Sequence, residues 1–520
     1  MTANHLWHNV CPLDEILPDT GVAALVGGRQ IAVFRVGNGI HALDNYDPHS
    51  GANVLSRGIV GDLNGEPVVA SPIYKQHFSL ITGRCIEDAD KSVRAWPARL
   101  HEGRVWVRAQ ALRIARKRRL VVVGNGMAGM KVVEDLLGIA PSAYEITVFG
   151  AEPHGNYNRI LLSPLLAGEK RFEDILLHPL EWYRDKGVVL HAGDPVVAID
   201  RQRRRVRSAA GHEVEYDRLL LATGSTPIVL PIPGKDLQGV VTFRDLQDVN
   251  AMLAASRTHR DAVVIGGGLL GLEAANGLKK QGMNVTVVHL CETLMERQLD
   301  APAAQLLQAS LEQRGLSFRM NARTTALLGD DGRVQAVQLD DGTLLRADLV
   351  VMAVGIRPNV ELAKVAGLRC ERGVIVDDTL QTYDPSIYAV GECVQHRKST
   401  YGLVAPLFEQ ARVCAAHLAE FGIGRYVGSI PATQLKVTGI DLFSVGDFNG
   451  TPRSESMVLR DSKRGIYKHL VIENDRVRGA VLYGDVQDSG WYTDLIAQGS
   501  DIGPLRAKLL FGPTAAGVER

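Results

Sequence analysis

The chain of 520 residues has few cysteines, and no two of them form a C-x-x-C pair. The six cysteines are scattered, without a spacing typical of metal ligands: Cys11, Cys85, Cys291, Cys370, Cys393 and Cys414. Neither a disulfide framework nor an all-cysteine iron–sulfur site is expected, and no metal site is predicted. The predicted helix 130–137 also lacks cysteine, which argues against a flavoenzyme that reduces disulfides through a reactive thiol.

The sequence also lacks a net charge and a long apolar run. Its 58 basic residues balance 58 acidic residues, so we expect neither nucleic acid nor a membrane surface as a partner. No run approaches the ~18 apolar residues that a membrane-spanning helix requires. The segment 1–5 does not show the charged-then-apolar order of a signal peptide, and we therefore expect a cytoplasmic protein.

Glycine, by contrast, is abundant, with 53 residues, and two glycine clusters follow predicted buried strands. Strand 120–123 precedes Gly124, Gly126 and Gly129, and strand 262–265 precedes Gly266, Gly268 and Gly271. A turn without Cβ atoms lets a pyrophosphate approach the backbone, and the N-terminus of the following helix attracts its charge. The repeated pattern predicts that the chain binds two dinucleotides.

The similarity between the two copies extends beyond their glycine clusters. Each copy ends in an apolar strand followed by glycine, at Thr223-Gly224 in the first and at Gly355 in the second. A later segment, 382–392, reads as a short strand ending in Gly391-Glu392, where a carboxylate can hold a flavin ribityl hydroxyl. We therefore expect an NAD(P)H-binding domain, 239–345, inserted into an FAD-binding domain that spans 120–238 and 346–425.

The flanking segments differ from this repeated unit. Residues 1–110 contain short β-type runs separated by turn residues and predict a small all-β domain. A basic linker, 111–119, follows and is expected to be a solvated connector. Residues 430–520 are again rich in predicted strands and end in helical pieces. The predicted fold is multidomain: an all-β domain, two α/β Rossmann-type domains and a small C-terminal α+β domain.

Acidic side chains about 20 residues beyond a glycine cluster are expected to bind a ribose hydroxyl. Glu152 is the candidate in the first copy. In the second copy the corresponding strand ends in His289, and Glu292 follows shortly after it. The choice between NADH and NADPH stays open, although NADH is favoured because no arginine directly follows the strand. Either glutamate is alternatively a solvent-facing loop residue.

Two further residues are candidates for catalysis. Glu273, predicted on the first turn of the helix after the second cluster, is placed to face a nicotinamide stacked on the flavin. Arg159 and Glu392 are candidates for tuning the charge of the reduced flavin, because hydride transfer needs alignment and electrostatic support rather than an acid or base. The alternatives are a glutamate favoured by the helix dipole and an arginine in a surface ion pair.

Residues 120–425 resemble the flavoprotein reductases of the glutathione reductase-like (pyridine nucleotide-disulfide oxidoreductase) superfamily, in the branch with rubredoxin and ferredoxin reductases. Several motifs resemble more specifically the FAD domain of the large subunit of NAD(P)H-dependent assimilatory nitrite reductase: Val148-Phe149-Gly150-Ala151-Glu152-Pro153, Tyr157-Asn158-Arg159, Val288-His289-Leu290, Tyr388-Ala389-Val390-Gly391-Glu392-Cys393 and Gly402-Leu403-Val404-Ala405-Pro406. The resemblance implies FAD and NADH or NADPH as cofactors. Pro164 departs from the ferredoxin reductases, where a lysine often follows the arginine segment.

The N-terminal domain resembles a Rieske fold, whose cluster ligands form a C-x-H and a C-x-x-H pair. The corresponding loops here read Asp47-Pro48-His49 and Ser71-Pro72-Ile73-Tyr74, so three of the four ligands are replaced. No [2Fe–2S] cluster is therefore expected, as in the Rieske-like small subunit of the same nitrite reductase. His49 is expected to be structural, and the domain to serve as a docking module.

The resemblance implies a reductase in which NAD(P)H reduces FAD and electrons pass to an iron–sulfur partner, with a separate assimilatory nitrate or nitrite reductase as first choice. Because the chain lacks cysteine-rich segments, it is not expected to reduce nitrite by itself. Two alternatives remain open. One is a rubredoxin or ferredoxin reductase of an oxygenase system, and the other is a redox-sensing flavoprotein akin to apoptosis-inducing factor.

Overall fold

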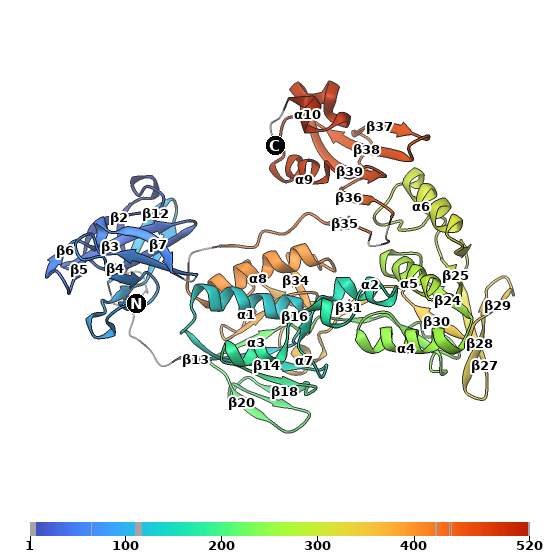
Figure 1. Cartoon of the computed structure of the whole chain (residues 1–520), viewed down its shortest axis with the longest axis horizontal. Helices are drawn as coiled ribbons and strands as arrows, with labels where there is room; N and C mark the ends of the chain where they lie inside the picture. Colours follow the sequence, from blue (N-terminus) through green and yellow to red (C-terminus); the bar gives the residue numbers. More distant parts are fainter. Residues whose placement is uncertain are drawn as a thin grey trace.

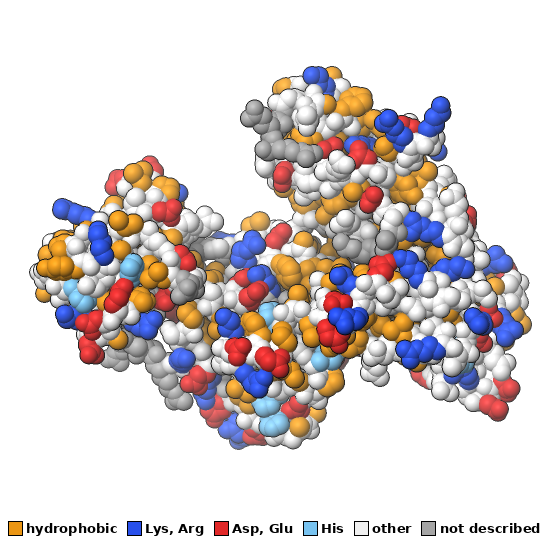
Figure 2. Space-filling view, viewed as in Figure 1, with side chains coloured by type: hydrophobic (Ala, Val, Ile, Leu, Met, Phe, Trp, Pro, Cys, Tyr) orange, Lys and Arg blue, Asp and Glu red, His pale blue; other side chains and the backbone are white. Residues whose placement is uncertain are grey.

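The computed structural model describes residues 7–63, 65–109, 117–421, 424–435, 437 and 439–517. Figure 1 shows an N-terminal β domain, two central α/β units and a C-terminal domain above them. In the space-filling view the N-terminal and C-terminal domains form separate lobes on the central body (Figure 2). Within the described residues, no helix combines the length and the apolar character needed to cross a bilayer.

The N-terminal domain consists of short strands and single-turn 3₁₀ helices. One sheet has the order β10 (Ala95–Trp96), β4 (Gly39–Asp44), β3 (Arg29–Val36), β2 (Thr20–Val26), and a second has the order β1 (Trp7–Pro12), β12 (Arg104–Arg108), β11 (Ala98–His101). A third sheet has the order β7 (Ile59–Leu63), β8 (Glu66–Ala70), β9 (His77–Ser79), and a two-stranded sheet pairs β5 (Tyr46–Asp47) with β6 (Ala52–Asn53). Val33, Phe34 and Leu43 are completely buried in its interior. The predicted all-β domain is confirmed.

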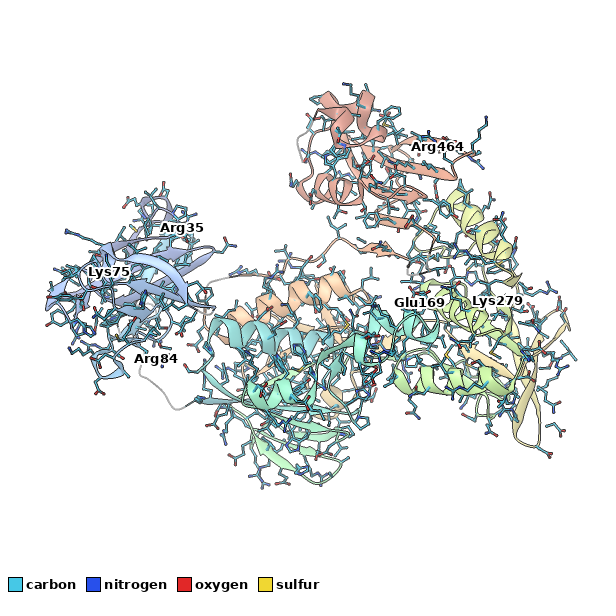
Figure 3. The ribbon with its side chains drawn as sticks, viewed as in Figure 1. Arg35, Lys75, Arg84, Glu169, Lys279 and Arg464 are labelled. Atoms are coloured by element: carbon cyan, nitrogen blue, oxygen red, sulfur yellow. The ribbon has the colours of Figure 1, made fainter. Side chains whose placement is uncertain are left out.

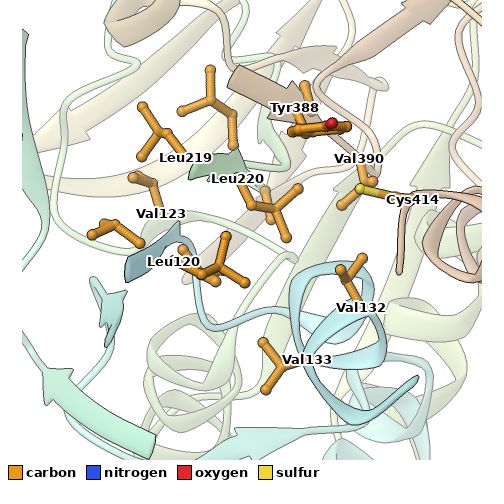
Figure 4. Packing of buried hydrophobic residues seen from close by; sticks show 14 of the residues in the cluster. Leu120, Val123, Val132, Val133, Leu219, Leu220, Tyr388, Val390 and Cys414 are labelled. Carbon is orange, nitrogen blue, oxygen red and sulfur yellow. The ribbon is translucent and has the colours of Figure 1, made fainter. Parts of the chain in front are cut away.

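The first α/β unit contains a parallel five-stranded sheet. Its order is β17 (Val188–Ala192), β14 (Tyr144–Gly150), β13 (Arg118–Val123), β21 (Arg218–Leu221), β33 (Ile387–Ala389). Residues 120–123 are all buried, as expected for a parallel strand covered on both faces. Figure 4 shows Leu120 and Leu220 packed with Val132 of α1 (Met127–Ile139) and Cys414 of α8 (Val404–Leu418) in one core.

The second α/β unit repeats this arrangement. Its parallel sheet has the order β23 (Val240–Thr242), β30 (Leu349–Met352), β24 (Asp261–Ile265), β25 (Asn284–Val288), β26 (Ser317–Arg319). Its helices are α4 (Leu246–Thr258), α5 (Leu269–Lys280) and α6 (Ala301–Gln313). Strand β33 follows this unit in sequence but pairs with β21 of the first unit, with Tyr388 opposite Leu220. The chain therefore leaves the first sheet, builds the second and returns to the first.

Smaller sheets and short helices are attached to the two units or connect them. Two three-stranded antiparallel sheets are β18 (Val196–Asp200), β19 (Arg205–Ser208), β20 (Glu213–Glu215) and β27 (Thr324–Asp330), β28 (Arg333–Leu339), β29 (Leu344–Arg346). The pair β22 (Ser225–Pro227) and β31 (Ile356–Pro358) connects the units. The remaining pieces are β15 (Asn156–Tyr157), β16 (Leu176–His178), β32 (Val374–Val376), β34 (Val394–His396), α2 (Leu162–Leu166), α3 (Leu180–Asp185) and α7 (Glu361–Val365).

The C-terminal domain is an antiparallel sheet with helices against it. Its order is β35 (Ala432–Gln434), β36 (Leu442–Gly446), β39 (Arg476–Tyr483), β38 (Ile466–Glu473), β37 (Glu455–Asp461), and its helices are α9 (Ser489–Gln498) and α10 (Pro513–Ala516). It contacts the second unit where Asp300, which caps α6, accepts a hydrogen bond of 2.5 Å from the Tyr467 hydroxyl. The predicted fold class is confirmed for all parts of the chain, whereas the domain boundaries stay predictions.

The basic segment between the first two domains is only partly described. Residues 111–116 of the predicted linker 111–119 lie outside the described residues. Strand β13 begins at Arg118, earlier than expected, and its two arginines form ion pairs. The Arg118 guanidinium lies 2.7 Å from the Glu420 carboxylate, and that of Arg119 lies 2.6 Å from Glu215. The end of the basic run is thus part of the first sheet rather than a solvated connector.

Candidate active site at the junction of the two α/β units

A cavity of about 650 Å³ lies between the two α/β units. Its walls come from both units and from β35 of the C-terminal domain, which contributes Ala432 and Gln434. The cavity brings together nine residues predicted for the site: Gly124, Gly126, Glu152, Arg159, Thr223, Gly224, Glu273, Gly391 and Glu392. The remaining predicted residues are Gly129, Gly266, Gly268, Gly271, His289, Glu292 and Gly355, and they do not line it.

The first residue of each glycine cluster lies where only glycine fits. Gly124 has φ of +114°, and an added Cβ would lie 2.2 Å from the Ala222 carbonyl oxygen. Gly266 has φ of +119°, and its Cβ would lie 2.3 Å from the Ala353 carbonyl oxygen. Both turns thus press against the following parallel strand of their own sheet. The same geometry in both units supports a shared function for the two loops.

The helices that follow these turns begin without a side-chain cap. Gly126 and Gly268 occupy the N-cap positions of α1 and α5, and neither helix has an acidic residue in its first turn. A Cβ added at either glycine would meet nothing within 4 Å. By contrast, Asp245 and Asp300 cap α4 and α6 with carboxylate oxygens. The first N–H groups of a helix that no side chain caps, at the positive end of the helix dipole, form an anion site. The two uncapped helices therefore fit the phosphates of two dinucleotides.

The other predicted glycines have packing roles. A Cβ at Gly129 would lie 2.8 Å from the Ala222 side chain, and one at Gly271 would lie 2.0 Å from the Gly266 carbonyl oxygen. Both glycines thus let a helix pack closely on its strand, as expected for the third glycine of such a cluster. Gly355 has φ of +113° at the turn after β30 and accepts a hydrogen bond from the Ile228 N–H.

Glu152 and Arg159 contact each other directly on the cavity wall. The Arg159 guanidinium forms an ion pair with the Glu152 carboxylate, which also accepts a hydrogen bond of 2.8 Å from the Tyr157 hydroxyl. Burial raises the pKa of Tyr157, so this hydroxyl remains a donor at neutral pH. Arg159 also donates to the Arg244 carbonyl oxygen at 3.1 Å. Arg159 is therefore part of a partly buried network and not in the surface ion pair considered as its alternative.

Glu392 is held by two donors from other segments. Its carboxylate forms an ion pair with Arg244, located just before α4, and accepts a 2.8 Å hydrogen bond from the Ser225 hydroxyl. The preceding Gly391, with φ of +90°, donates its N–H to Gln410 Oε1 at 2.9 Å. No sequence motif marks Arg244, so its place in the site is seen only in the folded chain.

Glu273 lies one turn deeper in its helix than predicted. Helix α5 begins at Leu269, so Glu273 belongs to the second turn, and the prediction of a first-turn residue is wrong. Its side chain is buried and accepts a hydrogen bond of 2.5 Å from the Ser163 hydroxyl of α2. Just after α2, Glu169 forms an ion pair with Lys280 at the end of α5, and Figure 3 labels Glu169 and the adjacent Lys279. Ser163 and Glu273 thus connect the two units inside the cavity.

His289 supports the second glycine turn. Its Nδ1 accepts a hydrogen bond of 3.0 Å from the Gly267 N–H, and its Nε2 lies 3.1 Å from the Thr293 carbonyl oxygen. The ring is buried, so its nitrogens shape the turn and do not face solvent. Glu292 is exposed on the following loop. Thr223, another predicted site residue, also has a hydrogen-bond partner within the protein, since its hydroxyl donates to the Asn359 carbonyl oxygen at 2.8 Å.

Three family models match successive parts of the chain. Residues 118–417 match the pyridine nucleotide-disulphide oxidoreductase model, residues 6–108 the Rieske-like [2Fe-2S] domain and residues 431–500 the rubredoxin NAD+ reductase C-terminal domain. The chain belongs to the pyridine nucleotide-disulphide oxidoreductase family. The family binds FAD and a nicotinamide dinucleotide, and the two glycine turns with their uncapped helices fit both groups.

The chain is similar to several known proteins. It is 49% identical over 386 residues to "Nitrite reductase [NAD(P)H]" of Bacillus subtilis (strain 168), covering 74% of this chain and 48% of that protein. It is 42% identical over 402 residues to "Assimilatory nitrate reductase electron transfer subunit" of the same strain, covering 77% and 52%. The chain thus spans about half the length of these relatives. The solved ferredoxin reductase for the CYP199A2 system of Rhodopseudomonas palustris is 29% identical, with a TM-score of 0.67 and coverage of 72% and 93%.

The match of residues 6–108 to the Rieske-like [2Fe-2S] domain contradicts the prediction that no [2Fe–2S] cluster is expected, and that prediction is wrong. The prediction considered only local spacing in two loops. In the structure Asp47 accepts a 2.7 Å hydrogen bond from Ser71, and His49 Nε2 lies 3.6 Å from the sulfur of the more distant Cys85. A Rieske centre is held by two histidines and two cysteines. His49 and Cys85 offer ligand atoms of these two kinds.

Proposed function

We propose that this protein is an FAD-dependent NAD(P)H oxidoreductase that passes electrons to an iron–sulfur partner, as the electron-transfer component of nitrate or nitrite assimilation. The observation that carries the proposal is the cavity shared by two dinucleotide-binding units. In the described part of the chain no cysteine lines this cavity, so a thiol pair is not available there as the electron acceptor. This observation supports electron transfer to a separate acceptor.

Residues in the cavity and on the loops around it would bind different parts of the two cofactors. The N-terminus of α1 would bind the FAD pyrophosphate, Glu152 a ribose hydroxyl and Glu392 the ribityl chain. The N-terminus of α5 would bind the nicotinamide dinucleotide pyrophosphate, with Glu292 the candidate for its ribose. The chemistry supplied by FAD at this site would be hydride acceptance from the nicotinamide and one-electron release to the partner.

The chemistry requires alignment more than proton transfer. Glu273 is buried and accepts a hydrogen bond from the Ser163 hydroxyl. It would determine on which side of the cavity the nicotinamide binds. Arg159 would place a positive charge near the reduced cofactor. Burial acts to lower the pKa of its guanidinium, but the neighbouring Glu152 carboxylate helps to keep that pKa raised. Such fixed charges act without reorganisation during the reaction.

The acceptor is proposed from the relatives. Two of them are named for nitrite reduction and for electron transfer to assimilatory nitrate reductase, and the chain aligns with both over about three quarters of its length. We infer that this protein donates electrons to a nitrate or nitrite reductase subunit and does so in the cytoplasm, where NADH and NADPH are available.

The proposal is tested by anaerobic rapid mixing of the FAD-loaded protein with NADH or NADPH and then with an acceptor. We expect the flavin absorbance to bleach and to recover on addition of an assimilatory nitrate reductase subunit, but not on addition of nitrite alone. Failure of the purified protein to bind FAD would refute the oxidoreductase function. Bleaching without recovery by any iron–sulfur protein would refute only the electron-transfer role and favour a redox sensor.

A second candidate is a reductase for rubredoxin or a ferredoxin. The match of residues 431–500 to the rubredoxin NAD+ reductase C-terminal domain and the likeness to a solved ferredoxin reductase favour it. In the same experiment, fast recovery with rubredoxin or ferredoxin and slow recovery with the nitrate reductase subunit would select this acceptor.

A further inference from the structure

A group of metal-binding side chains lies outside the cavity, beyond the carboxyl end of β17. His191, Asp194 and His212 each offer one ligand atom, and these atoms all lie within 4.8 Å of one another. The three residues come from the end of β17, the turn after it and the turn between β19 and β20. Because the third residue is distant in sequence, their spacing resembles no local metal motif.

The fold places each of the three side chains. The His191 ring stacks on Phe149 of the neighbouring strand β14, with ring centroids 4.5 Å apart and an angle of 9° between the planes. The Asp194 N–H donates to the Gly150 carbonyl oxygen at 2.8 Å, and its Oδ1 accepts from the Ala210 N–H at 2.8 Å. These contacts fix His191 and Asp194 before any ligand binds.

His212 completes the group from the opposite side. Its Nδ1 lies 2.8 Å from Asp194 Oδ2, and its ring centroid lies 4.5 Å from that of His191. Ligands at 2.0–2.2 Å from a tetrahedral zinc ion are themselves about 3.3 Å apart, so small movements of the side chains suffice to admit an ion. Imidazole nitrogen and carboxylate oxygen are both zinc ligands.

We propose that His191, Asp194 and His212 bind a Zn²⁺ ion, with water in the remaining coordination position. The ion would fasten the turn between β19 and β20 to the end of β17. The turn that follows β17 lies beside the cofactor cavity, because its Gly193 N–H donates to the Glu152 carbonyl oxygen at 2.9 Å. Zinc would thus stabilise the segment that carries the predicted ribose-binding Glu152.

Another group of three, His289, Cys291 and Glu296, meets the same distance criterion in the described part of the chain. There both His289 nitrogens already have partners, since Nδ1 accepts from the Gly267 N–H and Nε2 faces the Thr293 carbonyl oxygen. Zinc binding would cost a hydrogen bond that shapes the glycine turn. In the first group, zinc binding would replace the hydrogen bond between His212 Nδ1 and Asp194 Oδ2, which does not involve a glycine turn of the cofactor sites.

The test is a titration of the FAD-loaded, full-length protein with Zn²⁺ by calorimetry, and with Co²⁺ by visible spectroscopy. We expect one equivalent to bind, with the visible bands of a nitrogen- and oxygen-ligated cobalt ion, and His212→Ala to weaken binding at least about 100-fold. The His212 side chain is 53% exposed, so this variant is expected to fold and to retain FAD. His191→Ala provides a second variant with the same expected loss.

Two controls separate this site from other sources of binding. His8→Ala removes an exposed histidine of the N-terminal domain and is expected to bind zinc like the unchanged protein. Cys291→Ser tests the competing group and is also expected to have no effect. The proposal is overturned if the unchanged protein binds no zinc, if both histidine variants bind it normally, or if Cys291→Ser alone abolishes binding.

Discussion

Arg244 and Glu392 form an ion pair across the junction of the two α/β units. Arg244 lies between β23 and α4 of the second unit, whereas Glu392 follows β33 of the first. Their side chains are only 19% and 12% exposed, and Ser225 donates a further hydrogen bond to the carboxylate. This pair holds the two dinucleotide sites in a fixed relation at the point where both cofactors must meet.

Replacing Arg244 with methionine should destabilise the protein by ~3 kcal/mol, because it leaves the Glu392 carboxylate partly buried without its counter-charge. The measurement is unfolding in urea, monitored through the release of flavin. Arg346→Ala removes an arginine that is 79% exposed beside Asp261 and should change stability by at most ~0.5 kcal/mol. The double variant Arg244→Met/Glu392→Gln should recover part of the loss. Equal effects of Arg244→Met and Arg346→Ala would contradict a structural role for the pair.

The features that the sequence predicted are those whose physical cause is local. A glycine turn between a strand and a helix needs residues that are close in sequence, so both loops, from Gly124 and from Gly266, were predictable. The return of the chain at Glu392 was also predictable, because a short apolar strand precedes it. These patterns determine the fold class.

The missed features depend on residues brought together by folding. Arg244 and Glu392 are separated by 148 positions, and Ser163 and Glu273 by 110. No periodicity links such pairs, because their contact depends on how the two units are packed. The contact that His289 makes could not be predicted for the same reason, since only the folded turn shows that its ring accepts a hydrogen bond from the Gly267 N–H.

Glu152→Gln should weaken FAD binding about 10- to 100-fold, because the variant removes a charged hydrogen-bond acceptor and leaves Arg159 without its partner. The measurement is the dissociation constant of FAD from the refilled apoprotein. Glu292→Gln is the matched control, since this exposed glutamate belongs to the other dinucleotide unit. It should leave FAD binding unchanged and raise only the KM for NADH. Loss of FAD from both variants alike would refute this assignment.

Glu273→Gln should slow the reduction of FAD by NADH about tenfold while leaving the FAD content unchanged, because the amide disturbs the hydrogen bond from Ser163 and with it the alignment of the nicotinamide. Anaerobic stopped-flow gives the reduction rate directly. Glu169→Gln changes a glutamate just after α2, where it pairs with Lys280, and should leave the rate unchanged. If both variants reduce FAD at the normal rate, Glu273 has no part in alignment.

His41 gives the N-terminal domain a dependence on acidity. Its Nδ1 lies 3.1 Å from the Leu80 carbonyl oxygen, its Nε2 has no hydrogen-bond partner in the described part of the chain, and its ring lies 4.6 Å from that of Phe421. Burial lowers the pKa of His41 from 6.5 to about 4. A proton on Nε2 would place a charge in a buried site, with no acceptor for the new N–H.

The unfolded chain therefore binds a proton at His41 at a higher pH than the folded protein does. Stability is fully present above pH 6.5 and falls as the pH decreases from 6.5 towards 4, by ~3 kcal/mol in total. Urea unfolding of the N-terminal domain, followed by tryptophan fluorescence between pH 4 and 7, measures this slope. His41→Gln cannot take up the proton and should flatten the slope, whereas His8→Ala, at an exposed position, should retain it. A slope that persists unchanged in His41→Gln would assign the acid sensitivity to other groups.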